Sequence, residues 1–184
     1  KGAFDYRTGP NQINSAGGPD AFGYRWIDSD EPGGPAFGWV DISTTGSSLD
    51  SASAWISTGT FTGGDEGYFP VVLPFPFSFY GVNKDTVFIG SNGNIMFQRP
   101  TGNVYNNATF PTAGDAVDDH VGVWWDDLQV RSGARVYYGA NGGNFVVQFQ
   151  GMALYNATVG NYTFEVILSP GGTIKMQYLS MGYN

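Results

Sequence analysis

The chain has 184 residues, a formal net charge of −8 and no cysteine, with 41% hydrophobic and only 13% charged residues. The acidic balance argues against a nucleic-acid partner because few cations are available to displace counterions from phosphate. Disulfides and thiolate metal sites are excluded, and no apolar run reaches the ~18 residues that a membrane helix needs.

Residues 1–21 lack sustained periodicity and predict an N-terminal arm or linker, whereas residues 22–184 predict a single domain. The first acidic stretch, "DSDEPGGP", begins at Asp28. It starts like a helix–loop–helix calcium loop, but Pro32 and Trp39 occupy the fifth and twelfth positions, where that motif needs oxygen ligands. Two alternatives stay open, namely a turn shaped by Asp and Ser side chains or a non-helical calcium site.

Short alternating apolar runs follow, which are typical of antiparallel strands with one solvated face. "PFPFSFYG" places Phe75, Phe77 and Phe79 on one face, and Pro74 and Pro76 indicate an edge strand or a strand entry. Three hairpins are predicted, around Asn92-Gly93, Asn141-Gly142-Gly143 and Pro170-Gly171-Gly172. With no helical period, the pattern predicts an all-β antiparallel sandwich, jelly-roll-like, of roughly ten to twelve short strands.

The second acidic stretch is "DAVDDHVGVWWDDLQV", in which "VGVWW" reads as a buried strand with an Asp pair at each end. Neighbouring residues on a strand face opposite sides, so neither pair makes two catalytic carboxylates on one face. The single histidine, His120, reads as a strand-start residue, and no nucleophile elbow accompanies it. We therefore expect no enzymatic activity. The acidic residues of this stretch are Asp115, Asp118, Asp119, Asp126 and Asp127.

Hard carboxylate oxygens on tight loops favour Ca²⁺. The expected metal ligands are Asp28, Asp30, Glu31, Asp126 and Asp127. Exposed tryptophans could stack on sugar rings; the candidates are Trp26, Trp39 and Trp125. Asn-x-Thr triplets, which are glycosylation acceptors in secreted proteins, begin at Asn107, Asn156 and Asn161.

Five segments together resemble an accessory β-sandwich module of large secreted and cell-surface proteins of bacteria and archaea, with a distant likeness to nidogen. They are "PDAFGYRWIDSDEPGGPAFGWVDIS", "LPFPFSFYG", "VFIGSNGNIMF", "VGVWWDDL" and "NYTFEVILSPGGTIKMQYL". The resemblance implies a non-enzymatic extracellular module and carries no catalytic residues. It also implies one more strand after "IKMQYL", so we expect that the chain was cut, that order ends there, or that a partner supplies the strand.

The sequence thus favours a secreted or surface-exposed binding or structural module, stabilised by calcium and presenting a sheet face or an open edge. Its expected partners are other domains of a parent polypeptide, neighbouring subunits or glycans. Two alternatives remain open: a subunit of an extracellular filament or coat that pairs strands with neighbouring copies, and a carbohydrate-binding or carbohydrate-active domain.

Overall fold

A computed structural model describes residues 16–59, 61–62, 64–105, 112, 116–157 and 161–182. These residues form thirteen β-strands and no helix. The described part of the chain therefore contains no helix that could span a membrane. The chain divides into two compact units, Lys1–Gly38 and Trp39–Asn184. Residues 22–38, which the sequence reading grouped with the sandwich, therefore belong with the first unit.

In the first unit, residues 16–38 are described and contain a short antiparallel pair, β1 (Ala16–Gly17) and β2 (Trp26–Ile27). The Asp20 carboxylate organises the turn between them by accepting the N–H groups of Phe22, Gly23 and Tyr24 at 3.0, 2.8 and 2.8 Å. This local arrangement matches the ability of Asp to bond nearby backbone groups.

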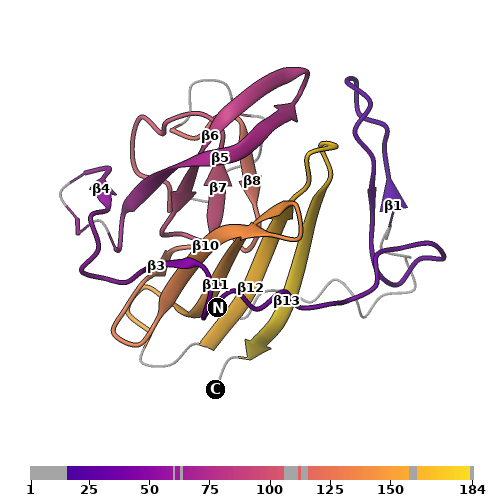
Figure 1. The fold of residues 1–184 in the computed structure, drawn as a ribbon. Helices are drawn as coiled ribbons and strands as arrows, with labels where there is room; N and C mark the ends of the chain where they lie inside the picture. Colours follow the sequence, from indigo (N-terminus) through magenta and orange to yellow (C-terminus); the bar gives the residue numbers. More distant parts are fainter. Residues whose placement is uncertain are drawn as a thin grey trace. The chain divides into compact units, whose positions relative to one another are not determined.

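The second unit holds two antiparallel sheets (Figure 1). The larger runs in the order β13-β12-β11-β10-β3, and β9 also pairs with β11. Two of the predicted hairpins, β10–β11 and β12–β13, are confirmed. The strands are β3 (Ser47–Leu49), β9 (Leu128–Gln129), β10 (Arg135–Asn141), β11 (Asn144–Leu154), β12 (Asn161–Leu168) and β13 (Ile174–Gly182).

The smaller sheet runs in the order β4-β5-β6-β7-β8. The predicted hairpin at Asn92-Gly93 joins β6 to β7, and His120 begins β8 as expected. The strands are β4 (Ile56–Ser57), β5 (Gly67–Phe79), β6 (Val82–Gly90), β7 (Asn94–Met96) and β8 (His120–Gly122).

The inner faces of both sheets supply one hydrophobic core, which confirms the predicted all-β sandwich. Phe149 and Phe164 stack within the larger sheet, with ring centroids 4.8 Å apart. On the smaller sheet, Phe77 stacks on Phe97 at 5.1 Å. Two stacked aromatic pairs, one from each sheet, therefore anchor the core.

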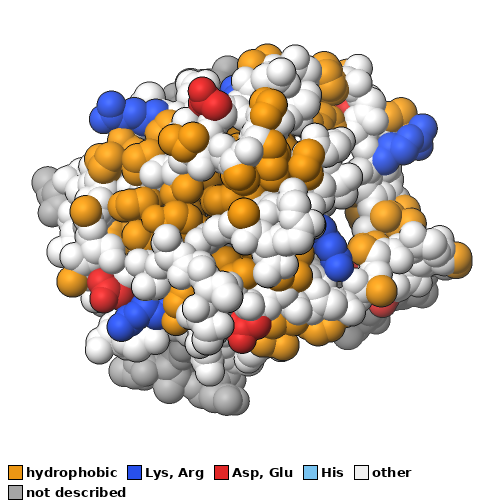
Figure 2. Space-filling model, in the orientation of Figure 1, with side chains coloured by type: hydrophobic (Ala, Val, Ile, Leu, Met, Phe, Trp, Pro, Cys, Tyr) orange, Lys and Arg blue, Asp and Glu red, His pale blue; other side chains and the backbone are white. Residues whose placement is uncertain are grey.

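Hydrophobic side chains reach the surface where β5 lies near β10. Figure 2 shows them gathered over these two strands. Phe69 of β5 contacts Trp55 and Tyr138 of β10, with ring centroids 6.4 and 5.9 Å away, and all three rings are half-buried. Val72 of β5 is 76% exposed. The apolar side chains over β5 and β10 together form the largest apolar surface seen in Figure 2.

The long strands at the sheet edges differ in chemistry. β5 pairs with β4 only at its first two residues, so among the described residues most of its outer edge has no partner strand. Pro70, Pro74 and Pro76 lie along this part of β5, the last two where its pairing with β6 shifts register. Proline has no N–H group, so it makes this edge a poor template for another strand, in agreement with the predicted edge strand. β13, at the edge of the larger sheet, has nine residues and no proline.

The middle of the outer face of the larger sheet is covered, so the prediction of one solvated face is wrong there. Gln148, which alternation along β11 turns away from the core, is 2% exposed, whereas Gln150 two residues further on is exposed. Residues 40–42, which we call the strap, lie on this face because the Ile42 side chain packs on Val146 and Ile167. Covering by a segment distant in sequence explains why strand alternation alone misjudged the face.

Candidate functional site

The turn Ser91-Asn92-Gly93 between β6 and β7 lies against the segment that follows β8. Trp124 donates its backbone N–H to the Gly93 oxygen at 3.0 Å, and Asp126 donates to the Asn92 oxygen at 3.3 Å. Gly93 has a φ of 74°, and a Cβ there would lie 2.3 Å from the Trp124 backbone oxygen. Both the backbone conformation and the close approach therefore require glycine.

These contacts also end the strand earlier than predicted. β8 stops at Gly122, so "VGVWW" is not one continuous strand. Trp124 and Asp126 instead bond the turn, and Asp126 accepts the N–H of Asp127 at 2.8 Å. At the other end of β8, Asp119 forms an ion pair with Lys84. The two Asp pairs thus occupy separate places, as the sequence indicated.

The Asn92 side chain connects three segments of the chain. It is fully buried, and its Nδ2 donates to Glu66 Oε2 at 3.2 Å while its Oδ1 accepts the Leu128 N–H at 2.9 Å. Ser91 adds a parallel link, since its hydroxyl donates to the Asp65 backbone oxygen at 2.5 Å. The start of β5, the β6–β7 turn and the start of β9 are therefore held at one point.

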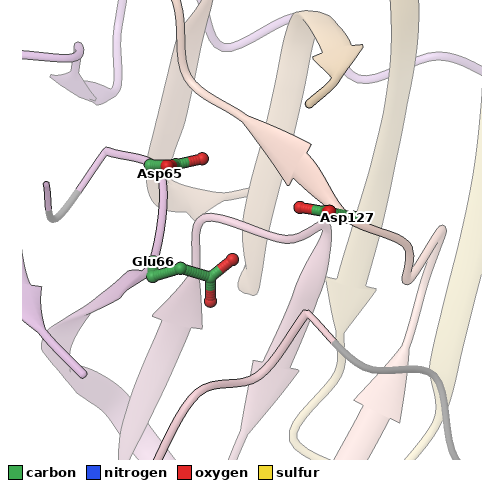
Figure 3. Close-up of side chains that lie close together, drawn as sticks. All are labelled: Asp65, Glu66 and Asp127. Atoms are coloured by element: carbon green, nitrogen blue, oxygen red, sulfur yellow. The ribbon is translucent and has the colours of Figure 1, made fainter. Parts of the chain in front are cut away.

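Three acidic side chains meet at this point. Asp65 and Glu66 precede β5, Asp127 precedes β9, and one carboxylate oxygen from each lies within 4.8 Å of the others (Figure 3). The Glu66 residue is only 2% exposed, and Asp65 and Asp127 are half-buried. Asp65 Oδ1 is buried and has no hydrogen-bond partner within the described residues. We call these three residues the acidic cluster.

The environment of the acidic cluster disfavours negative charge. Burial raises the pKa of Glu66 to about 7, opposed by hydrogen bonds from Asn92 and the Val104 backbone and reinforced by the charges of Asp127 and Asp65. Burial also raises the pKa of Asp65 and of Asp127, and neighbouring carboxylates add to the second effect. Such a group is stabilised by taking up positive charge, either as protons or as a cation with oxygen ligands.

The predicted metal ligands fall into two groups. Asp127 is in the acidic cluster, and Asp126 is its neighbour. Asp28, Asp30 and Glu31 belong to the first unit, where they form a turn: the Glu31 N–H donates to the Asp28 backbone oxygen at 3.3 Å, and the Asp30 N–H to Asp28 Oδ1 at 3.4 Å. This geometry matches the alternative in which Asp side chains shape a turn.

Sequence reasoning missed Asp65 and Glu66. Their signal is an Asp-Glu pair that follows Gly-Gly and directly precedes β5. The pair lies about sixty positions before Asp127 in the chain, and nothing in the local pattern joins them. Their convergence depends on how the sheets stack.

The candidate stacking residues differ in exposure. Trp26, in the first unit, is 53% exposed, whereas Trp39 is half-buried at the start of the second. Trp125 is also half-buried, and its indole N–H donates to the Val104 oxygen. Its neighbour Trp124 is the more exposed, at 39%. Trp124 therefore presents more ring surface than Trp125.

Two of the three glycosylation candidates are exposed. Asn156 follows β11 and Asn161 begins β12, so both side chains are accessible on the second unit. Asn107 lies outside the described residues, as does Asp115 of the second acidic stretch.

Comparison with known protein families identifies the second unit. A family model described as NIDO related, that is, nidogen-related, matches residues 41–184. The match spans the acidic cluster and both sheets of the second unit, including the turn at Asn92. No curated protein and no solved structure matches the chain.

Proposed function

The chain belongs to the NIDO-related family, and from this membership we propose that it is a non-catalytic extracellular module of a larger protein. Its role in this proposal is binding or structural, and its partners are other domains of the parent polypeptide. The family match supports the proposal because it covers nearly the whole second unit.

The chemistry of the site is consistent with a non-catalytic role. The polar groups around the turn form hydrogen bonds that join segments of the fold; they belong to Ser91, Asn92 and Asp126. A catalytic carboxylate needs access to substrate, whereas Glu66 is almost fully buried. The apolar side chains over β5 and β10 support a binding role, since larger apolar patches often mark interaction sites.

The acidic cluster is the proposed calcium site, and it is the observation that carries this part of the function. Calcium prefers carboxylate oxygens, and here three converge with one buried oxygen lacking a partner among the described residues. A cation bound by Asp65, Glu66 and Asp127 would link the start of β5, in the smaller sheet, to the start of β9, which pairs with the larger one. A chain without cysteine would thereby gain a cross-link between its sheets.

Thermal unfolding in EDTA, repeated with millimolar calcium and with magnesium, tests this site. A ligand that binds only the native state at a hundred times its Kd adds about 2.7 kcal/mol. For a domain of this size, each kcal/mol moves the Tm by about 2–4 °C. We expect calcium to raise the Tm by about 5–11 °C and magnesium to raise it less.

Two matched variants locate the ion. Asp127→Asn removes one carboxylate of the acidic cluster and should abolish the calcium shift, whereas Asp28→Asn in the turn of the first unit should keep it. If Asp28→Asn abolished the calcium shift and Asp127→Asn kept it, the ion would be assigned to the first unit. Superimposed melts of the unsubstituted chain would refute the calcium site and leave the proposed module without a resident ion.

A further inference from the structure

The strap is held on the larger sheet by side chains rather than by strand pairing. The Val40 N–H donates to Glu165 Oε1 at 3.1 Å, and the Ile42 N–H donates to Gln148 Oε1 at 2.9 Å. Figure 1 shows this part of the chain crossing the larger sheet on its way into β3. Because these two hydrogen bonds belong to no strand ladder, the strap can leave without breaking the pairing of any strand.

The acceptors belong to a row of polar side chains that runs across the sheet. Gln148 of β11 pairs with Glu165 of β12, and Glu165 pairs with Gln177 of β13. Gln177 donates to Glu165 Oε1 at 2.6 Å, so this one oxygen accepts from both the strap and β13. All three side chains are buried. The strap therefore seals a polar row that would otherwise face water.

Glu165 is the ionisable residue of this row. It is fully buried, and its Oε2 has no hydrogen-bond partner within the described residues. A buried carboxylate needs its oxygens hydrogen-bonded or paired with a cation. As a neutral acid, Glu165 keeps Oε1 as the acceptor of both donors and carries a proton on Oε2, which removes the buried charge. The buried Oε2 thus favours the neutral form, whereas the two donors to Oε1 favour the carboxylate.

We propose that the strap is a releasable, pH-sensitive closure, docked on the sheet while Glu165 is neutral and released when Glu165 loses its proton to water. Release exposes the polar row together with Val146 and Ile167, which Ile42 covers in the docked state. It also frees the chain between Gly38, where the first unit ends, and Ser47, where β3 begins. The proposal is independent of the calcium site, which involves other residues.

The charged and titratable groups around Glu165 agree with this assignment. Burial raises the pKa of Glu165, hydrogen bonds from Val40 and Gln177 and the charge of Lys175 on β13 oppose the rise, and Asp41 on the strap adds to it. Hydrogen bonds from Ser43 lower the pKa of Asp41, which therefore stays charged when the pH rises above 5. On β11 and β10 the row continues with Gln148 and Tyr137.

The sign of the pH effect follows from linkage. In the released strap, Glu165 meets water and has its ordinary pKa of 4.5, whereas its pKa is higher in the docked state. Glu165 therefore binds its proton more tightly in the docked state than in the released state. The free energy that this proton contributes to docking is fully present below pH 4.5 and decreases as the pH rises. Between the two pKa values, the docked-to-released ratio falls about tenfold per pH unit.

Amide hydrogen exchange of the full chain between pH 5 and pH 8, normalised to the intrinsic exchange rate at each pH, tests the strap. We expect protection of the peptide that contains residues 40–42 to fall with pH, about tenfold per unit over the sensitive range. The β6–β7 hairpin should keep constant protection. If protection of the strap is the same at both pH values, or rises with pH, the proposal is wrong.

Two variants separate the carboxyl from general charge effects. Glu165→Gln keeps an Oε1 acceptor and cannot ionise, so its strap should hold at pH 8 the protection that the unsubstituted chain shows at pH 5. Asp85→Asn removes an exposed carboxyl from β6 in the other sheet and should retain the full pH dependence. A pH-dependent strap in Glu165→Gln would overturn the assignment. The unsubstituted chain alone still decides the matter if that variant does not fold.

Discussion

Replacing Asn92 with alanine tests whether its side chain joins three segments of the fold. The substitution removes the donor to Glu66 at 3.2 Å and the acceptor of the Leu128 N–H at 2.9 Å, together with a longer bond of 3.5 Å from Nδ2 to the Asp65 backbone oxygen. Both partners are buried, so water cannot simply replace the lost amide. The change therefore leaves one backbone donor and one carboxyl without their partner.

The magnitude follows from those two groups. A buried N–H left unpaired costs about 1–3 kcal/mol, and a hydrogen bond to a charged group contributes about 1.5–3 kcal/mol. We expect Asn92→Ala to lower the free energy of unfolding by about 2.5–6 kcal/mol in total. At about 2–4 °C per kcal/mol, the Tm should fall by about 5–24 °C.

Urea unfolding gives the free energy directly, provided that the m-value is unchanged. The matched control is Asn83→Ala, because Asn83 is an exposed residue of the same type on β6 and should change stability by less than about 0.5 kcal/mol. A loss below about 1 kcal/mol for Asn92→Ala would refute the account of the turn as a structural joint.

Two further predictions concern the turn and the sheet edge. Gly93→Ala should cost at least about 2 kcal/mol in urea unfolding, and more than Gly142→Ala, since both glycines have positive φ but only the first has a backbone atom in the way of a Cβ. Equal losses would contradict the close approach. Replacing Pro74 and Pro76 together with threonine should restore donors to the β5 edge and increase concentration-dependent association in light scattering. Unchanged association would show that the prolines do not protect that edge.

Local sequence signals were sufficient for the hairpins. Asn92-Gly93 and Gly142-Gly143 adopt the positive φ values that tight turns need, at Gly93, Gly142 and Gly143, and the flanking strands alternate as expected. Such features depend on neighbouring residues alone. The sandwich followed from their number and spacing.

Features that depend on distant residues were not predictable in the same way. The acidic cluster joins Asp65 and Glu66 to Asp127, and no pattern in the sequence relates these stretches. Similarly, Gln148 reads as a solvent-facing residue until Ile42 is placed on the same face. In both cases the sequence supplied the residue types, and the packing of the sheets decided which residues meet.

The strap also bears on the order in which the protein can be completed. Its bond from Val40 to Glu165 spans 125 residues, and the bond from Ile42 to Gln148 spans 106. During synthesis from the N-terminus, residues 40–42 therefore emerge long before the strands that receive them. Closing so large a loop carries an entropic cost that is recovered only when β11 and β12 are in place. A docked strap would then indicate that β11 and β12 have been made and folded.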